Sequence, residues 1–227
     1  MQSKQKIQNT ASLIVSFTDS YTQSKQRKQN KQYKSKSTLS LAQVTSRLEY
    51  LWRQIENKKS CKQVIRIPKL LQSLIALVTF RLGIHLNEQT DLLRLKVRHW
   101  SKWCLRNIHF YADEQDQSEL VRQGYGRMMS ITFSTAGGVG EEEDKEIWNG
   151  LGEIQHFLRQ LHDGRNYPYT SFQPLPLLVR RTEEQIEEEG ASEEIEAQLN
   201  NKGMNGNIKM NATRAKAAIL NHFIHTH

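Results

Sequence analysis

The chain has 227 residues, which is enough for one compact domain with tails and too few for a large multi-site enzyme. Its two cysteines, Cys61 and Cys104, lie far apart and form no CxxC pair, and the chain has only 4 prolines and 12 glycines. These counts argue against a disulfide scaffold, a zinc ribbon and a collagen-like chain. They favour a reducing, intracellular compartment.

Charge is unevenly distributed along the chain. The sequence up to Arg106 has 21 Lys and Arg against 5 Asp and Glu, a formal charge of +16, and the remainder has 11 against 19, a formal charge of −8. This separation predicts a protein that binds a polyanion through its first half and contacts itself or a protein partner through its second half. The alternative interpretation is that the two halves attract each other within the fold.

Residues 1–37 predict a flexible basic arm. The run 25–36 has no acid and a Gln, Asn and Ser background that offers little to bury, so we expect it to be disordered. A flexible chain of cations can follow a phosphate backbone by releasing counterions. The contact residues predicted in the arm are Lys25, Arg27, Lys28, Lys31, Lys34 and Lys36. The same run fits a nuclear-import signal, and the scarcity of acids in residues 1–48 also suits an organelle transit peptide.

Residues 38–111 predict a basic core of about three helices. The first begins near Ser40, which forms a capping-box pattern with Gln43. After a basic connector over 57–62, residues 70–82 are apolar nearly all round, so this helix should lie centrally, and it is too short to cross a bilayer. The third helix opens at Asn87, a favourable N-cap, and runs to about residue 111.

The third helix carries a basic stripe. Arg94, Arg98, Lys102 and Arg106 recur every four residues, and no acid lies between the first and the last of them. We expect an outside anion to relieve their mutual repulsion, and a nucleic-acid backbone is the natural candidate. The alternative is a solvated face that pairs with the acidic half. Trp103 suits either stacking on a base or packing in the core.

Residues 112–164 predict a helical extension with a glycine hinge over 136–140. Within it the sequence indicates a short acidic helix over 113–123 and one short strand near 128–133. The following helix has an apolar seam at steps of four and three, formed by Ile147, Leu151, Ile154, Leu158 and Leu161. Two heptads are too few for an independent coiled coil, so the seam should pack on the core or on another subunit.

Residues 165–227 predict an aromatic and proline segment, an acidic linker and a terminal docking helix over 211–224. The segment 166–178 is expected to be extended and to lie over a groove of this protein or of a partner. Together with the seam 147–161, it is the predicted surface for a protein partner or for self-association.

Residues for catalysis or metal binding do not stand out. Glu153 and His156 form an ExxH pair, but the second such pair of a di-iron site is missing. No Ser/His/Asp, Cys/His or paired-carboxylate arrangement rises above chance. The sequence therefore predicts no enzyme, no metal site and no cofactor.

Taken together, these patterns predict a mainly helical, non-enzymatic subunit that binds DNA or RNA within a larger complex in the nucleus, with the mitochondrion or the cytoplasm as alternatives. Base-reading side chains are scarce on the basic stripe, so phosphate contacts should dominate. The alternative function is a structural or adaptor subunit, organellar or viral, whose basic half contacts an acidic protein or a lipid surface. Salt dependence separates the two, because nucleic-acid binding weakens steeply with ionic strength.

Overall fold

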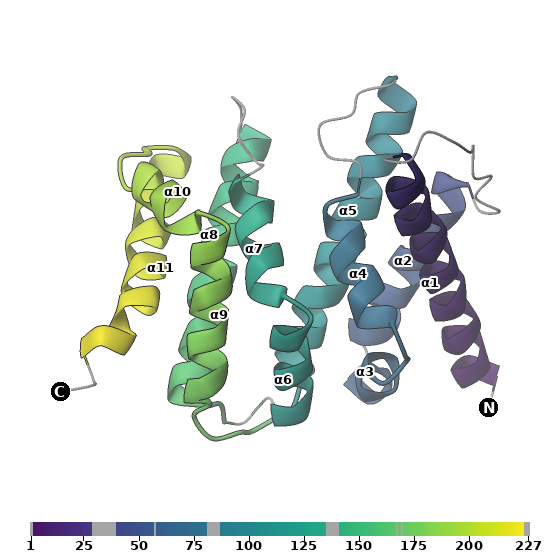
Figure 1. The fold of residues 1–227 in the computed structure, drawn as a ribbon, viewed down its shortest axis with the longest axis horizontal. Helices are drawn as coiled ribbons and strands as arrows, with labels where there is room; N and C mark the ends of the chain where they lie inside the picture. Colours follow the sequence, from purple (N-terminus) through teal and green to yellow (C-terminus); the bar gives the residue numbers. More distant parts are fainter. Residues whose placement is uncertain are drawn as a thin grey trace. The chain divides into compact units, whose positions relative to one another are not determined.

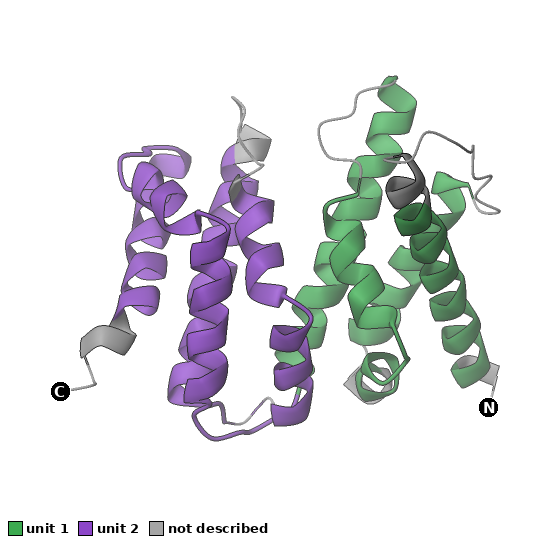
Figure 2. Cartoon of the chain, viewed as in Figure 1, with its two compact units in different colours: residues 1–112 green, residues 113–227 purple. Residues whose placement is uncertain are grey.

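A computed structural model describes residues 2–28, 40–56, 58–80, 87–134, 141–166, 168 and 170–224. The prediction of a mainly helical chain is confirmed, and the chain divides into two compact units, residues 1–112 and 113–227 (Figure 2). Within the described ranges the only β pairing is a single bridge between Arg165 and Phe172. No helix in these ranges is long and apolar enough to cross a membrane.

The first unit is built around a long central helix. Its helices in chain order are α1 (Gln2–Lys28), α2 (Leu41–Glu56), α3 (Lys58–Ile65), α4 (Leu70–Val78) and α5 (Glu88–Tyr111) (Figure 1). Helix α5 packs against α2, α3 and α4, and α1 packs against α2 and α4. The predicted three-helix core is therefore not confirmed, because α1 and α3 belong to the same packed unit.

Two helix starts follow the local sequence signals. Ser40 Oγ accepts from the Gln43 amide at 3.2 Å while Gln43 Oε1 accepts from the Ser40 amide at 2.9 Å, which is the reciprocal pattern of a capping box. The side chain of Asn87 accepts from the Thr90 amide at 2.9 Å and caps α5. Each pair satisfies backbone donors that a helix start leaves without a partner.

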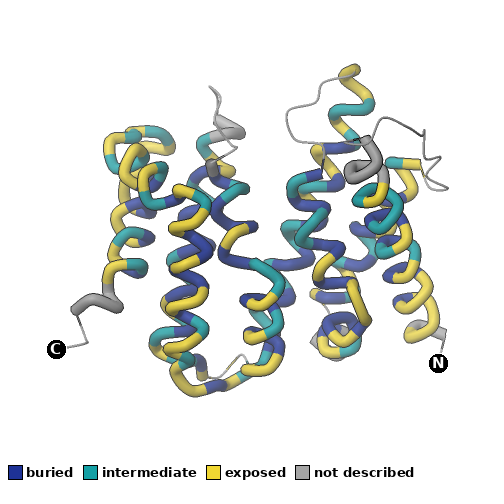
Figure 3. Tube along the Cα trace, in the orientation of Figure 1, coloured by how far each residue is buried: buried dark blue, intermediate teal, exposed yellow. Residues whose placement is uncertain are grey.

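The predicted disordered arm is wrong for residues 2–28, which form α1. Ile7, Ala11, Ile14 and Phe17 recur at steps of three and four and are all buried (Figure 3). The rings of Phe17 and Tyr21 lie 5.6 Å and 4.7 Å from the ring of Phe80, just after α4. Burial of this apolar row holds the helix on the unit. Residues 29–39 lie outside the described residues.

The predicted basic connector over 57–62 also differs, because α3 begins at Lys58 within it. Cys61 and Val64 are fully buried, and Ile65 and Ile67 are nearly so. The lysines of this segment suggested a connector. Among and just after them, Cys61, Val64 and Ile65 recur at helical spacing and form an apolar face that packs on the core.

The second unit is also mainly helical in its described residues. Its helices are α6 (Glu114–Arg122), α7 (Tyr125–Ser134), α8 (Glu141–Asp163), α9 (Pro176–Glu188), α10 (Ala191–Gln198), the 3-10 turn η1 (Met204–Gly206) and α11 (Asn207–Ile224). Helix α8 is central and packs against α7, α9 and α11, which run alongside it (Figure 1).

The strand predicted near 128–133 is wrong, because these residues lie in α7. Tyr125, Met129 and Phe133 repeat every four residues and are buried, which is the spacing of a helix face. Helix α8 approaches α7 closely at Gly150, where an added Cβ would lie 2.6 Å from Phe133 Cβ. The predicted glycine hinge over 136–140 falls outside the described residues.

The seam and the aromatic segment are taken up inside this unit. All five seam residues, from Ile147 to Leu161, are buried where α8 packs on its neighbours, so they are not available to a partner. Phe172 is 7% exposed and pairs with Arg165 through two backbone hydrogen bonds, and from Pro176 onward the segment is already α9. The segment 166–178 is therefore only partly extended, and Leu177, at 82% exposed, is its outward apolar residue.

The acidic stretch after 182 forms α9 and α10 instead of a linker. Ile186 and Ile195 are buried, and between them the chain turns at Gly190 with φ at +67°. Gln185 joins three helices, because its Nε2 donates to the Val121 carbonyl at 2.8 Å and its Oε1 accepts from the Gly126 amide at 3.1 Å. Burial of the isoleucines and of Gln185 leaves most of the glutamates on the outside.

Candidate nucleic-acid interface

The charge boundary coincides with the boundary between the units. No Lys, Arg, Asp or Glu lies between Arg106 and Asp113, so unit 1–112 carries the whole formal charge of +16 and unit 113–227 carries −8. A polyanion is therefore attracted by one folded unit and repelled by the other. The first unit is the place to look for a nucleic-acid interface.

Arg94, the first residue of the predicted stripe, points into the unit. Its side chain is only 5% exposed, and Nη1 lies 3.1 Å from Oδ1 of Asp91, one turn earlier on α5. A buried guanidinium needs such a partner, because an unpaired charge is costly to remove from water. Arg94 is thus held by an ion pair within α5 and does not face an outside anion.

Arg98 is half-buried and ties α5 to the end of α4. Its Nη1 donates to the carbonyl oxygen of Phe80 at 3.1 Å. Burial, reinforced by the positive charge of Arg94, lowers the pKa of Arg98, while Asp91 acts in the opposite direction. The guanidinium stays charged, since arginine is not deprotonated in proteins, and it fixes α5 to the turn that follows α4.

The later part of the stripe is partly exposed. Lys102, Trp103 and Arg106 are all of intermediate exposure. The Arg106 guanidinium lies 4.9 Å from the centre of the Trp103 ring and 5.8 Å from that of Phe110, which are cation–π distances. One part of Trp103 is therefore already covered by a cation, so the two side chains form a single amphipathic patch.

The arm residues are not brought to the stripe by anything the structure describes. Lys25, Arg27 and Lys28 lie in the last turn of α1, and their side chains are not among those described. Lys31, Lys34 and Lys36 lie outside the described residues. Their contribution to an interface stays a prediction.

The structure exposes cations that the sequence prediction did not select. These cations are exposed and make no ion pair with any described residue. They are Lys4 on α1, Arg47 on α2, Arg66 just after α3 and Lys96 on α5. Two other exposed cations of this unit are partnered, since Arg53 pairs with Glu49 and Lys69 pairs with Asp19. The four unpaired side chains, which we call the outer cations, are able to exchange counterions for phosphates.

Helix α1 and helix α2 also share an aromatic and cationic contact. Lys6 Nζ lies 4.9 Å from the centre of the Tyr50 ring, and Arg47 precedes Tyr50 by one turn on α2. In the sequence, the signal for this contact is the pair Lys4 and Lys6, which stands beside the apolar row of α1. The pair can be recognised as part of a surface only once α1 is assigned as a helix.

The ExxH residues take part in hydrogen bonds within the second unit. Glu153 is buried and accepts from the Tyr125 hydroxyl at 3.0 Å, and His156 contacts the Gln160 amide at 3.1 Å. Among the described residues no group of three or more His, Cys, Asp and Glu is placed to hold a metal ion.

Comparisons of the whole chain with protein-family models, with curated proteins and with solved structures found no match.

Proposed function

We propose that this protein is a non-enzymatic nucleic-acid-binding subunit whose unit 1–112 contacts the phosphate backbone. The observation that carries the proposal is the division of charge between the units, +16 on one and −8 on the other. A cationic surface on a folded unit releases condensed counterions when it meets a polyanion, which favours binding. The negative charge of the acidic unit repels the polymer, so we assign contacts with a protein partner to that unit.

The contacts in this proposal come from the outer cations and from Lys102 and Arg106. Arg94 and Arg98 support α5 from inside and do not contact phosphate. Because the outer cations lie on separate elements of the unit, they suit a spread of phosphate contacts more than the reading of base edges in a groove. We therefore expect affinity with little sequence preference.

The experiment is fluorescence anisotropy of labelled duplex DNA, single-stranded DNA and RNA with the full chain over a salt series. The test variant changes Arg47, Arg66 and Lys96 to Gln, and the matched control changes Arg181, Lys202 and Lys209 to Gln. Both remove three exposed positive charges, the first from the basic unit and the second from the acidic one. The proposal predicts that only the first variant binds more weakly, with the salt slope reduced by about 0.9 on duplex DNA, or about 0.7 on single strands, for each phosphate that is no longer neutralised. Equal weakening in both variants, or no binding at moderate salt, would contradict it.

A second candidate function is an adaptor whose basic unit contacts a protein or a lipid surface. It is favoured by Leu92 and Leu95 on α5, which are 50% and 51% exposed and lie beside the exposed Lys96. Apolar side chains next to a cation suit a surface that is both apolar and negative. Binding to anionic vesicles that is abolished in a Leu92→Ser/Leu95→Ser variant, with no binding of nucleic acid, would favour this function.

A further inference from the structure

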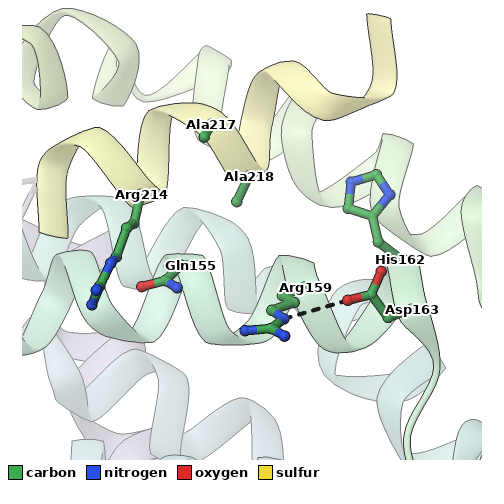
Figure 4. A pocket seen from close by; sticks show the side chains of 7 residues that line it. All are labelled: Gln155, Arg159, His162, Asp163, Arg214, Ala217 and Ala218. Carbon is green, nitrogen blue, oxygen red and sulfur yellow. Dashed lines mark hydrogen bonds and ion pairs between the residues drawn. The ribbon is translucent and has the colours of Figure 1, made fainter. Parts of the chain in front are cut away.

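A small cavity lies between α8 and α11 in the second unit. It has a volume of about 240 Å³ and is lined by Gln155, Arg159, His162 and Asp163 of α8 and by Arg214 and two alanines of α11 (Figure 4). Ala217 and Ala218 stand where longer side chains would fill the space, so the polar groups of α8 remain reachable. Figure 4 shows Arg214 extending from α11 towards Gln155 on α8.

This cavity has a charge opposite to that of its unit. Two guanidinium groups line it against the one carboxylate of Asp163, although the unit as a whole carries −8. Two other exposed arginines of the unit are paired with glutamates. Arg122 pairs with Glu119, and Arg180 pairs with Glu184. Arg214, like the exposed Arg181 outside the cavity, makes no ion pair with any described residue.

The second guanidinium is held only loosely. Arg159 Nε lies 3.4 Å from Asp163 Oδ2, and the two side chains are 72% and 66% exposed. Such an exposed pair contributes little, because water and salt screen it. A ligand with a stronger negative charge can therefore take Arg159 away from Asp163 without a large cost.

We propose that this cavity binds a small phosphate-bearing anion between the guanidinium groups of Arg159 and Arg214. The planar fork of arginine matches the oxygens of a phosphate and can donate two hydrogen bonds to it. The volume is below the roughly 300–1,000 Å³ of sites for drug-sized ligands, so it suits a phosphate group or a small monoester better than a nucleotide. This site lies in the acidic unit and does not depend on the proposed binding of nucleic acid by the basic unit.

The test follows the arginine Nε–Hε signals of the full chain by NMR during titration with inorganic phosphate and with phosphoserine, at ionic strength matched with sodium chloride. We expect saturable shifts of Arg159 and Arg214 and none with chloride alone. Tighter binding of phosphoserine would identify a monoester as the ligand, and tighter binding of inorganic phosphate would identify the free ion. Absence of saturable shifts with both would overturn the proposal.

Three variants separate a built site from general charge attraction. Arg214→Gln should weaken binding about ten-fold or more, since it removes a charge-assisted contact. Arg180→Gln is the matched control, because it removes an exposed arginine of the same unit outside the cavity, and it should leave the affinity unchanged. Asp163→Asn should strengthen binding about three-fold by freeing Arg159 and removing a repelling carboxylate. The proposed site would be contradicted if Arg214→Gln and Arg180→Gln weakened phosphate binding equally, or if Asp163→Asn bound phosphate more weakly.

Discussion

Arg98 Nη1 donates a hydrogen bond of 3.1 Å to the carbonyl oxygen of Phe80, and this contact joins the middle of α5 to the turn that closes α4. Phe80 in turn packs its ring against Phe17 and Tyr21 of α1. Three helices of the first unit thus meet at this pair. Arg98, which the sequence places on a face that binds a ligand, instead connects helices inside the unit.

The first prediction concerns this contact. Arg98→Gln should lower the free energy of unfolding by about 1 kcal/mol, because the Phe80 carbonyl loses a charged donor. Affinity for nucleic acid, measured on the folded fraction, should not change. Arg47→Gln should behave in the opposite way, with an unchanged unfolding midpoint in urea and weaker binding. If Arg98→Gln weakened binding without loss of stability, Arg98 would face the ligand after all.

The ion pair between Arg94 and Asp91 gives the second prediction. Arg94→Met leaves a carboxylate without this partner and should cost about 1–3 kcal/mol, less than a fully buried pair, because Asp91 is 30% exposed. Adding Asp91→Asn should recover part of that loss, so the double variant is more stable than the sum of the single changes predicts. A double-mutant cycle by urea unfolding measures this coupling, and additive losses would show that the pair contributes nothing.

The close approach of α7 and α8 gives the third prediction. Gly150→Ala should destabilise the second unit by about 1–3 kcal/mol, because its Cβ would lie 2.6 Å from Phe133 Cβ. Gly152→Ala is the control on the same helix, where the nearest atom is the Asn211 side-chain nitrogen at 3.3 Å. That change should cost clearly less than Gly150→Ala, since alanine favours the helix and the Asn211 nitrogen, which donates to the Trp148 carbonyl at 3.0 Å, needs to move only slightly. Thermal unfolding distinguishes the two, and equal shifts in Tm would contradict the close approach.

The fourth prediction is a pH dependence of stability. Burial, with smaller effects from Glu187 and Glu184, raises the pKa of Glu183 from 4.5 to about 7, and His162 Nε2 lies 3.7 Å from its Oε1. Between those two pH values the folded state keeps a proton that the unfolded state has released. Stability contributed by this group therefore falls as pH rises from 4.5 to about 7 and stays low above it.

Glu183→Gln tests this directly, because glutamine keeps the shape and cannot ionise. We expect the variant to be more stable than the natural chain at pH 8 by about 1–3 kcal/mol, with little difference at about pH 5. Glu184→Gln, on the exposed side of the same helix, should leave the pH profile nearly unchanged. Urea unfolding at several pH values measures both, and a gain that is equal under acidic and alkaline conditions would exclude titration of Glu183 as the cause.

Local signals predicted the fold best. The capping residues Ser40 and Asn87 act through neighbours three positions away, so their effect is visible in the sequence. The apolar row of α1 was harder to recognise, because Ile7 stands alone in a polar segment and the apolar residues from Ala11 to Phe17 form only a short run. Only packing against α2 and α4 supplies the free energy that makes the helix persist.

The candidate site was predicted less well, and α5 shows why. Helix α5 buries Arg94 and leaves Leu92 and Leu95 half exposed, which reverses the order that hydrophobicity alone predicts. Helical spacing groups residues into faces, but it does not determine which face meets the rest of the unit. That depends on where α2 and α4 lie, and on Asp91 being placed to neutralise Arg94.

The most direct test of the central claim is lysine footprinting by acetylation of the full chain, with and without saturating single-stranded DNA or RNA, read by mass spectrometry. The exposed lysines Lys4 and Lys96 report on the basic unit, and the exposed lysines Lys145, Lys202 and Lys209 report on the acidic one. We expect nucleic acid to protect the first group several-fold and to leave the second group unchanged. Equal protection of both groups, or protection of neither, would contradict the proposed function.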